Sequence, residues 1–244
     1  MYRLDRILSE AGAASRKELR AMIRAGRVTV DGAVVTDERQ KFDAAAIRVC
    51  IDAQPVRLWA PVLIMLHKPA GFLTAADDPK ARTVMELVPE QYRKLGVMPV
   101  GRLDKDTEGL LLLTDDGALA HDLLAPKKHV DKVYFVRTDG VLNDADCAAF
   151  AAGITLGDGL SCLPARLEII KSGAQSEALV TIHEGKFHQI KRMLASCGKP
   201  VVYLKRLSMG TLTLDEKLSK GEYRLLTAEE IGKLRESGQF AQEK

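Results

Sequence analysis

Hydrophobic residues follow a helical spacing near the start of the chain. Segment 4–11 places an apolar residue at every third or fourth position, which predicts an amphipathic helix that ends at Gly12. Ser15 with Glu18 three residues later is a capping box, and it predicts a second helix that ends at Gly26. Two short β-branched segments around an Asp-Gly turn follow and predict a hairpin.

Further along, the pattern changes to apolar runs that are typical of strands, mixed with helical stretches. These runs are 62–66, 109–114, 133–138, 178–183 and 210–214. Such a mixture predicts an α+β fold. Between 54 and 61 the hydrophobic pattern breaks up and prolines flank the segment, which indicates a short linker with a boundary near Ala60. We therefore expect three parts: a small domain (1–59), a larger domain (60–232) and a polar C-terminal tail (233–244).

The composition fits a globular protein. The chain has 244 residues, of which 46% are hydrophobic and 28% charged, and this excludes collagen, coiled coil and disorder. No apolar stretch approaches the roughly 20 residues of a membrane span, and the charged start excludes a secretory signal. We expect a cytoplasmic protein without a membrane partner. The four cysteines and five histidines show no ligand spacing, so we predict neither a disulfide framework nor a metal site.

Charge is distributed unevenly, although the net charge is only +3. The first thirty residues carry seven basic and three acidic side chains, and segment 185–214 has no acidic residue at all. On the second predicted helix, arginines recur every three or four positions and form a cationic ridge: Arg16, Arg20, Arg24 and Arg27. This pattern is typical of a surface that binds a polyanion such as a nucleic acid. It is equally typical of a helix face that contacts only solvent. Lys17, next to Arg16, is a further basic residue that we expect to contact RNA.

The stretch RLDRILSEAGAASRKELRAMIRAGRVTVDGAVV resembles the S4 RNA-binding domain. The resemblance covers most of residues 1 to about 50. It implies that the cationic ridge contacts the RNA backbone and fixes its register without reading much sequence.

The most informative segment, 98–114, is a charged loop that leads directly into an apolar strand. Asp104 lies there between Arg102 and Lys105, where a carboxylate can be held ionised yet poorly hydrated. The pattern alone fits a structural ion pair as well. A hydrolase that uses Asp104 with Asp106 is another alternative, but we expect these two side chains to point to opposite faces.

Several ordered motifs resemble one enzyme family. Gly-Arg-Leu-Asp at 101–104, followed by Thr107 and Gly109-Leu-Leu, resembles the catalytic motif of the pseudouridine synthases, in the branch named for RsuA. Three further motifs agree with it: HKPAG at 67–71, KVYFV at 132–136 and EGKFHQIKRM at 184–193. With the S4 module in front, the chain is identified as a member of this family. The resemblance implies a mixed, mainly antiparallel sheet with flanking helices.

The resemblance also implies an activity and a set of site residues. The family isomerises a uridine within RNA to pseudouridine, without a cofactor. Asp104 matches its catalytic aspartate, Lys191 the basic residue that pairs with it, and Tyr134 the active-site tyrosine. Arg102 matches the residue inserted where the extruded base had stacked. If the pair is buried, Lys191→Ala should cost about 3–5 kcal/mol of stability.

The predicted contacts with RNA in the larger domain are mainly basic side chains: Lys128, His188, Arg192, Lys205 and Arg206. Leu204 is expected to form an apolar wall of the uracil pocket. We expect a monomer, since no extended apolar face is left unexplained.

The expected partner is ribosomal RNA or a small-subunit assembly intermediate. His188-Gln189 and the Asp-Asp-Gly turn at 115–117 resemble the small-subunit enzyme. They favour 16S ribosomal RNA (the uridine 516 type), with 23S ribosomal RNA as the alternative. A non-catalytic assembly factor would be favoured if Asp104 or Tyr134 were replaced, and both are present.

Overall fold

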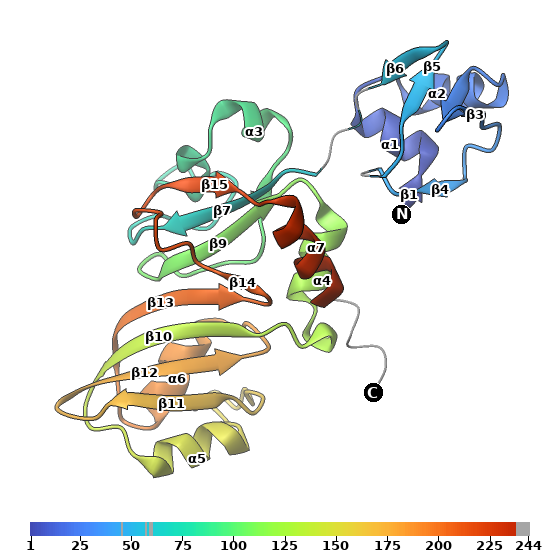
Figure 1. Cartoon of the computed structure of the whole chain (residues 1–244). Helices are drawn as coiled ribbons and strands as arrows, with labels where there is room; N and C mark the ends of the chain where they lie inside the picture. The colour runs from blue at the N-terminus through green and yellow to red at the C-terminus, as the bar shows by residue number, and fades with distance from the viewer. Residues whose placement is uncertain (45, 57, 59–60, 238–244) are drawn as a thin grey trace. The chain divides into compact units, whose positions relative to one another are not determined.

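The computed structural model describes residues 1–44, 46–56, 58 and 61–237 (Figure 1). The chain divides into two compact units, Met1–Pro61 and Val62–Lys244. The predicted boundary near Ala60 falls on positions outside the described residues. Each unit has its own hydrophobic core and is described by itself.

The first unit packs two helices against a small sheet. The helices are α1 (Leu4–Glu10) and α2 (Arg16–Arg24). The strands are β1 (Tyr2–Arg3), β2 (Val28–Val30), β3 (Ala33–Val34), β4 (Lys41–Phe42), β5 (Val49–Ile51) and β6 (Gln54–Val56). An antiparallel sheet has the order β3-β2-β5-β6, and β1 pairs with β4. Leu8 and Leu19 from the two helices are fully buried in the same core as Val28.

Local signals in this unit were well predicted, with one exception. The capping box is present, because the Ser15 hydroxyl accepts a hydrogen bond from the Glu18 backbone and the Glu18 carboxylate accepts one from the Ser15 backbone. The predicted start of the linker at residue 54 is wrong, because Gln54–Val56 forms strand β6. Pro55 had suggested a break, but β6 is an edge strand, where a residue without an N–H is tolerated.

The second unit is built on a nine-stranded sheet with the main order β11-β12-β10-β13-β9-β7-β15 (Figure 1). Its strands are β7 (Leu63–Lys68), β8 (Met98–Pro99), β9 (Glu108–Thr114), β10 (Lys132–Asp139), β11 (Arg166–Lys171), β12 (Gln175–Ile182), β13 (Val201–Met209), β14 (Leu212–Thr213) and β15 (Tyr223–Leu225). Strands β8 and β14 pair with β9 and β13. Neighbours are antiparallel except β13 and β9, which are parallel. The expectation of a mixed, mainly antiparallel sheet is confirmed.

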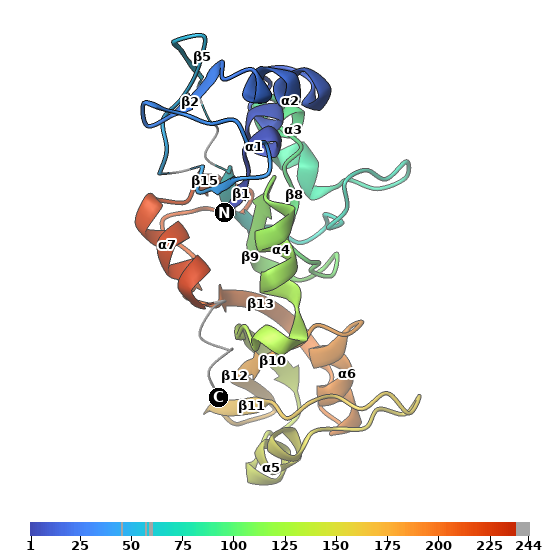
Figure 2. The same cartoon turned by 90° about the vertical axis from the view of Figure 1, so that its right-hand side faces the viewer.

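Helices cover both faces of this sheet. Helices α4 (Gly117–Leu124) and α7 (Ala228–Ser237) lie on one face, and α5 (Asp144–Ala152) and α6 (Gln189–Ser196) on the other (Figure 2). Three shorter segments are the 3-10 turns η1 (Val84–Leu87) and η2 (Pro126–Lys128) and the helix α3 (Glu90–Lys94). Strand β9 is apolar on both sides, because Leu110 faces the α4 and α7 side while Leu111 faces the opposite core.

The parallel junction between β9 and β13 depends on a glycine. Gly109 has a φ of +105°, and a Cβ there would lie 2.2 Å from the carbonyl oxygen of Arg206. Only glycine lets the two backbones approach this closely. At the same junction the Tyr203 hydroxyl donates a 2.7 Å hydrogen bond to Glu108. Burial and this bond raise the pKa of Tyr203 to about 12. The junction fixes where β9 begins, directly after the loop that carries Asp104.

The predicted polar tail from residue 233 is wrong at its start. Helix α7 continues to Ser237, and Leu234 is fully buried in the core beneath it. The residues around Leu234 are mostly polar and suggested a solvent-exposed tail, but Leu234 itself packs against the sheet. Residues 238–244 lie outside the described residues. Among the helices described, none is both long and apolar enough to cross a membrane.

Candidate active site

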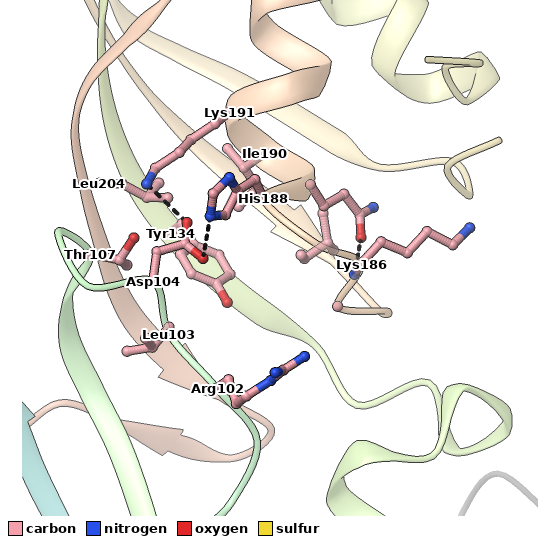
Figure 3. A pocket seen from close by; sticks show the side chains of 13 residues that line it. Arg102, Leu103, Asp104, Thr107, Tyr134, Lys186, His188, Ile190, Lys191 and Leu204 are labelled. Carbon is pink, nitrogen blue, oxygen red and sulfur yellow. Dashed lines mark hydrogen bonds and ion pairs between the residues drawn. The ribbon is translucent and has the colours of Figure 1, made fainter. Parts of the chain in front are cut away.

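A pocket lies where the start of β9 meets β10, β13 and the N-terminus of α6 (Figure 3). Its cavity is about 70 Å³. The residues that line it are Arg102, Leu103, Asp104, Thr107, Tyr134, Ile182, Gly185, Lys186, His188, Gln189, Ile190, Lys191 and Leu204. The fold therefore brings Asp104 together with Lys191, Tyr134 and Arg102, which come from three separate segments of the sequence.

Asp104 is held by two cationic or potentially cationic side chains from α6 and the residue before it. Lys191 Nζ lies 2.9 Å from Asp104 Oδ2, and His188 Nε2 lies 3.6 Å from Oδ1 (Figure 3). The predicted contact between Lys191 and Asp104 is thus present. His188 begins the helix with a left-handed backbone (φ +49°), which turns its ring toward the pocket.

The same lysine also binds a second carboxylate. Lys191 Nζ lies 2.5 Å from Asp106 Oδ1. Burial raises the pKa of Asp106, but the hydrogen bond and charge of Lys191 outweigh it, so the pKa lies below its usual value. Burial likewise lowers the pKa of Lys191, and the two carboxylates more than compensate, so it is raised. The ammonium group is therefore fixed in the charged form between the two acids.

Two predictions about this cluster need correction. Asp104 and Asp106 were expected to point to opposite faces, whereas Lys191 bridges them. The expectation was wrong in principle, since residues two apart in an extended segment share a face. The stability estimate for Lys191→Ala assumed a buried pair, but both partners are about one quarter exposed. Solvent screening lowers the expected cost to about 1 kcal/mol.

The loop that carries Asp104 is fastened from behind by a buried lysine. The Lys68 side chain at the end of β7 is fully buried, and its Nζ donates to the backbone carbonyls of Pro69, Asp104, Lys105 and Thr107 at 2.8–3.3 Å. Burial lowers its pKa to about 8, against the attraction of the nearby acids. The sequence contained a signal for this residue, because it is the second position of the HKPAG motif.

A second buried side chain, Thr74, holds the backbone of Leu103, the residue before Asp104. The buried Thr74 hydroxyl donates to the Leu103 carbonyl at 2.8 Å and accepts from the Leu103 amide at 3.2 Å. Thr107, three residues after Asp104, also lines the pocket and is 1% exposed. Its hydroxyl has no hydrogen-bond partner within the described part of the chain. The side chains of Lys68 and Thr74 thus hold the backbone of the loop, in addition to the contacts of Asp104 and Asp106 with Lys191.

The remaining pocket residues supply one aromatic, one apolar and one cationic surface. Tyr134 on β10 is 7% exposed and forms the pocket floor together with Leu204 on β13, which is 6% exposed. Arg102 is exposed and lies across the pocket from Lys191 (Figure 3). Among the residues that the structure describes, no His, Cys, Asp and Glu side chains form a group that could hold a metal ion.

The other predicted RNA contacts in this unit lie outside the pocket. Arg206 is 2% exposed and donates to the Leu110 carbonyl at 2.7 Å, so its predicted phosphate contact is wrong. The reason is that the basic stretch that contains it forms β13, a central strand of the sheet. Lys205 on the same strand is half-buried, Arg192 pairs with Asp158 at 2.5 Å, and Lys128 lies in η2.

In the first unit the cationic ridge is largely paired. Three of its arginines bind carboxylates of the same unit: Arg20 with Asp5, Arg24 with Glu38 and Arg27 with Asp52. Arg16 and Lys17 are exposed, and neither forms an ion pair within the described residues. The sequence showed the spacing of the ridge but not these partners, which lie 14 to 25 positions away.

Two family patterns match the chain. The pattern of the RNA pseudouridylate synthases matches residues 62–196, and that of the S4 domain matches residues 3–45. The first match contains Asp104, Tyr134, His188 and Lys191, and the second contains the cationic ridge.

Similar proteins span nearly the full chain. An uncharacterized RNA pseudouridine synthase of Bacillus subtilis (strain 168) is 42% identical over 96% of this chain and 98% of its own length. The ribosomal small subunit pseudouridine synthase A of Escherichia coli (strain K12) is 39% identical over 94% of this chain and 98% of its own length. A crystal structure of a pseudouridylate synthase, 35% identical, superposes with a TM-score of 0.66 over 96% of this chain and all of that chain.

Proposed function

The chain belongs to the RNA pseudouridylate synthase family, and on this premise we propose that it isomerises a uridine of ribosomal RNA, with the 516-type uridine of 16S ribosomal RNA as its target. The proposal of the small-subunit RNA rests on the similarity to the Escherichia coli enzyme of that name and on the residues His188-Gln189. The substrate is the naked RNA or a small-subunit assembly intermediate in the cytoplasm.

One observation carries the proposal. A single pocket joins a carboxylate held by an ammonium group, an aromatic ring and an apolar wall, from Asp104, Lys191, Tyr134 and Leu204. Isomerisation of a uridine requires that its N-glycosidic bond breaks, that the uracil turns, and that carbon 5 joins the ribose. Carbon 5 then loses its proton and N1 takes one up, so that no atom is gained or lost. The aromatic ring and the apolar wall offer surfaces against which the base is held during the turn.

Asp104 is the proposed catalytic residue. Its carboxylate acts on the ribose or the uracil ring, either as a nucleophile or by stabilising positive charge at the anomeric carbon. Both actions require an ionised carboxylate at a fixed place. Lys191 and His188 lie next to the Asp104 carboxylate. Lys68 and Thr74 donate hydrogen bonds to the backbone carbonyls of Asp104 and Leu103 and so fix the position of the loop.

Tyr134, Leu204 and Arg102 have proposed roles around the base. The Tyr134 ring stacks on the uracil, and its hydroxyl helps to move the proton from carbon 5. Leu204 forms the apolar wall beside it. A base must leave the helical stack to enter a pocket, at a cost of a few kcal/mol, and the exposed guanidinium of Arg102 fills the gap.

The S4 unit is proposed to bind the RNA backbone through Arg16 and Lys17, the two basic residues of α2 that form no ion pair among the described residues. Exchange of Arg16 and Lys17 for alanine should remove two phosphate contacts, so the slope of log Kd against log salt should fall by about 1.5–2. Filter binding at several salt concentrations measures this. The control is the pair Lys80→Ala and Lys171→Ala, two exposed lysines of the second unit with the same total charge. Equal slopes for the two double variants would contradict the proposal.

The test of the proposed function is a direct product map. The enzyme is added to unmodified 16S and 23S transcripts and to small-subunit assembly intermediates, and pseudouridine is located by carbodiimide-dependent reverse-transcriptase stops. We expect one stop, in 16S ribosomal RNA. A stop only in 23S ribosomal RNA would overturn the substrate, and no stop in any RNA that binds tightly would overturn ribosomal RNA as the substrate.

A further inference from the structure

An exposed aromatic side chain between two residues that line the pocket, Lys186 and His188, has no role in the proposed reaction. Phe187 precedes α6 and is 70% exposed, although large apolar side chains are usually buried. Its ring stacks on the ring of His188, with centroids 3.8 Å apart and an interplanar angle of 20°. His188 in turn lines the pocket and approaches Asp104. One face of the phenyl ring is therefore covered by a pocket residue, and the rest is available to solvent.

The loop that presents Phe187 is held rigidly from beneath. Gln189, 4% exposed, accepts a 3.0 Å hydrogen bond from the Lys186 amide and donates one of 2.9 Å to Glu184. Glu184 is 7% exposed and also accepts from the Leu163 amide at 2.8 Å. A buried network thus fixes the loop on both sides of the ring. The outward position of Phe187 is set by the fold, and a surface fixed in advance loses little entropy when it binds a ligand.

The surroundings match a nucleic acid. Segment 185–214 has no acidic residue, and the exposed Arg102 lines the pocket without an ion pair among the described residues. The other two cations at the pocket are paired, Lys186 with Glu184 and Lys191 with Asp104 and Asp106. An exposed aromatic ring near a cationic side chain is an arrangement with which proteins hold single-stranded bases, since every base offers a π-face. Phe187 is not among the residues that line the cavity beside Tyr134, so a base stacked on its ring is a different one from a base held in that cavity.

We propose that the Phe187–His188 stack is a binding site for a nucleobase adjacent to the target uridine. This inference rests on the proposed function. When the target leaves the helical stack, the bases on both sides of it lose a stacking partner; Arg102 fills the gap in the stack, and the phenyl ring stacks on the face of a neighbouring base that the guanidinium leaves uncovered. The site takes any base, so it contributes affinity and positioning rather than sequence specificity.

The test combines variants of Phe187 with changes in the RNA. The probe is a fluorescent hairpin from the ribosomal RNA around the uridine that the wild type modifies, and Kd is measured by anisotropy. Phe187→Ala should weaken binding by about 5- to 150-fold, and Phe187→Trp should restore it to within about 2-fold. The control is Ile170→Ala, which removes another exposed side chain, on β11, and should leave Kd unchanged.

A set of hairpins with one abasic site each, at the positions flanking the target, identifies the stacked base. At one position the abasic site should weaken wild-type binding and have no further effect on Phe187→Ala. A loss for Phe187→Ala that is the same on every hairpin, or no loss, would overturn the inference. Pseudouridine formation by the wild type on the intact hairpin tests the proposed function separately. If the wild type modifies no RNA, both fail.

Discussion

Asp104→Asn should abolish pseudouridine formation while the protein remains folded. The amide keeps the shape of the side chain but can neither act as a nucleophile nor stabilise positive charge, so we expect the single-turnover rate to fall by at least about 1000-fold. Lys191 keeps Asp106 as a partner, and the lost pair is partly exposed. The melting temperature should therefore change by no more than about 2 °C.

Asp106→Asn is the matched control, because it makes the same chemical change in the same loop and at the same lysine. Its carboxylate is 74% exposed and is not a lining residue of the pocket. We expect its rate to fall by no more than about 10-fold, the effect of a less well positioned Lys191. Equal losses for the two variants would mean that the lysine pair, rather than Asp104 itself, is what the reaction needs.

Lys68→Met should destabilise the second unit and slow the reaction together. The methionine fills the space, but the carbonyls of Pro69 and Thr107 lose the donor that Lys68 provides, and those of Asp104 and Lys105 keep only a backbone amide as donor. Buried acceptors without partners cost about 1–3 kcal/mol each when water cannot replace the donor. Partial relaxation of the loop reduces the total, so we expect a loss of about 3–5 kcal/mol in the free energy of unfolding.

Lys132→Met is the comparison that isolates this effect. Lys132 is also a buried lysine, 5% exposed, and burial also lowers its pKa to about 8. Its ammonium donates to a single carbonyl in the described structure, that of Val130 at 2.8 Å. Urea unfolding of both variants should show a loss several times larger for Lys68→Met. Similar losses in the free energy of unfolding would mean that the stability depends on the burial of a lysine and not on the hydrogen bonds from Lys68 to the Asp104 loop.

Local features of the fold could be predicted from the sequence. The capping box at Ser15 and the apolar run of β9 depend on residues close together in the chain, and both are present. Strand β13 was not predicted, because its basic residues suggested a surface. Its pairing with β10 and β9 buries Arg206, and that pairing is a property of the whole sheet.

The site was predicted in part for the same reason. Resemblance of the sequence motifs to those of a family was enough to assign Asp104, Lys191 and Tyr134 to one site. Lys68 and Phe187 lie within two of these motifs, but the resemblance assigned neither a role, because their surroundings are set by contacts between distant segments and by the shape of the loop before α6. Nor could spacing alone show that the arginines of α2 are paired with carboxylates.

The parallel pairing of β9 with β13 also governs when the pocket can exist. The bond from Arg206 to the Leu110 carbonyl joins residues 96 positions apart, so closing this part of the sheet requires a large loss of chain entropy before any contact compensates it. Folding should therefore complete the pocket late. During synthesis, a nascent chain that ends before β13 would carry the Asp104 loop without the Leu204 wall, and the enzyme would become active only after that strand has emerged from the ribosome.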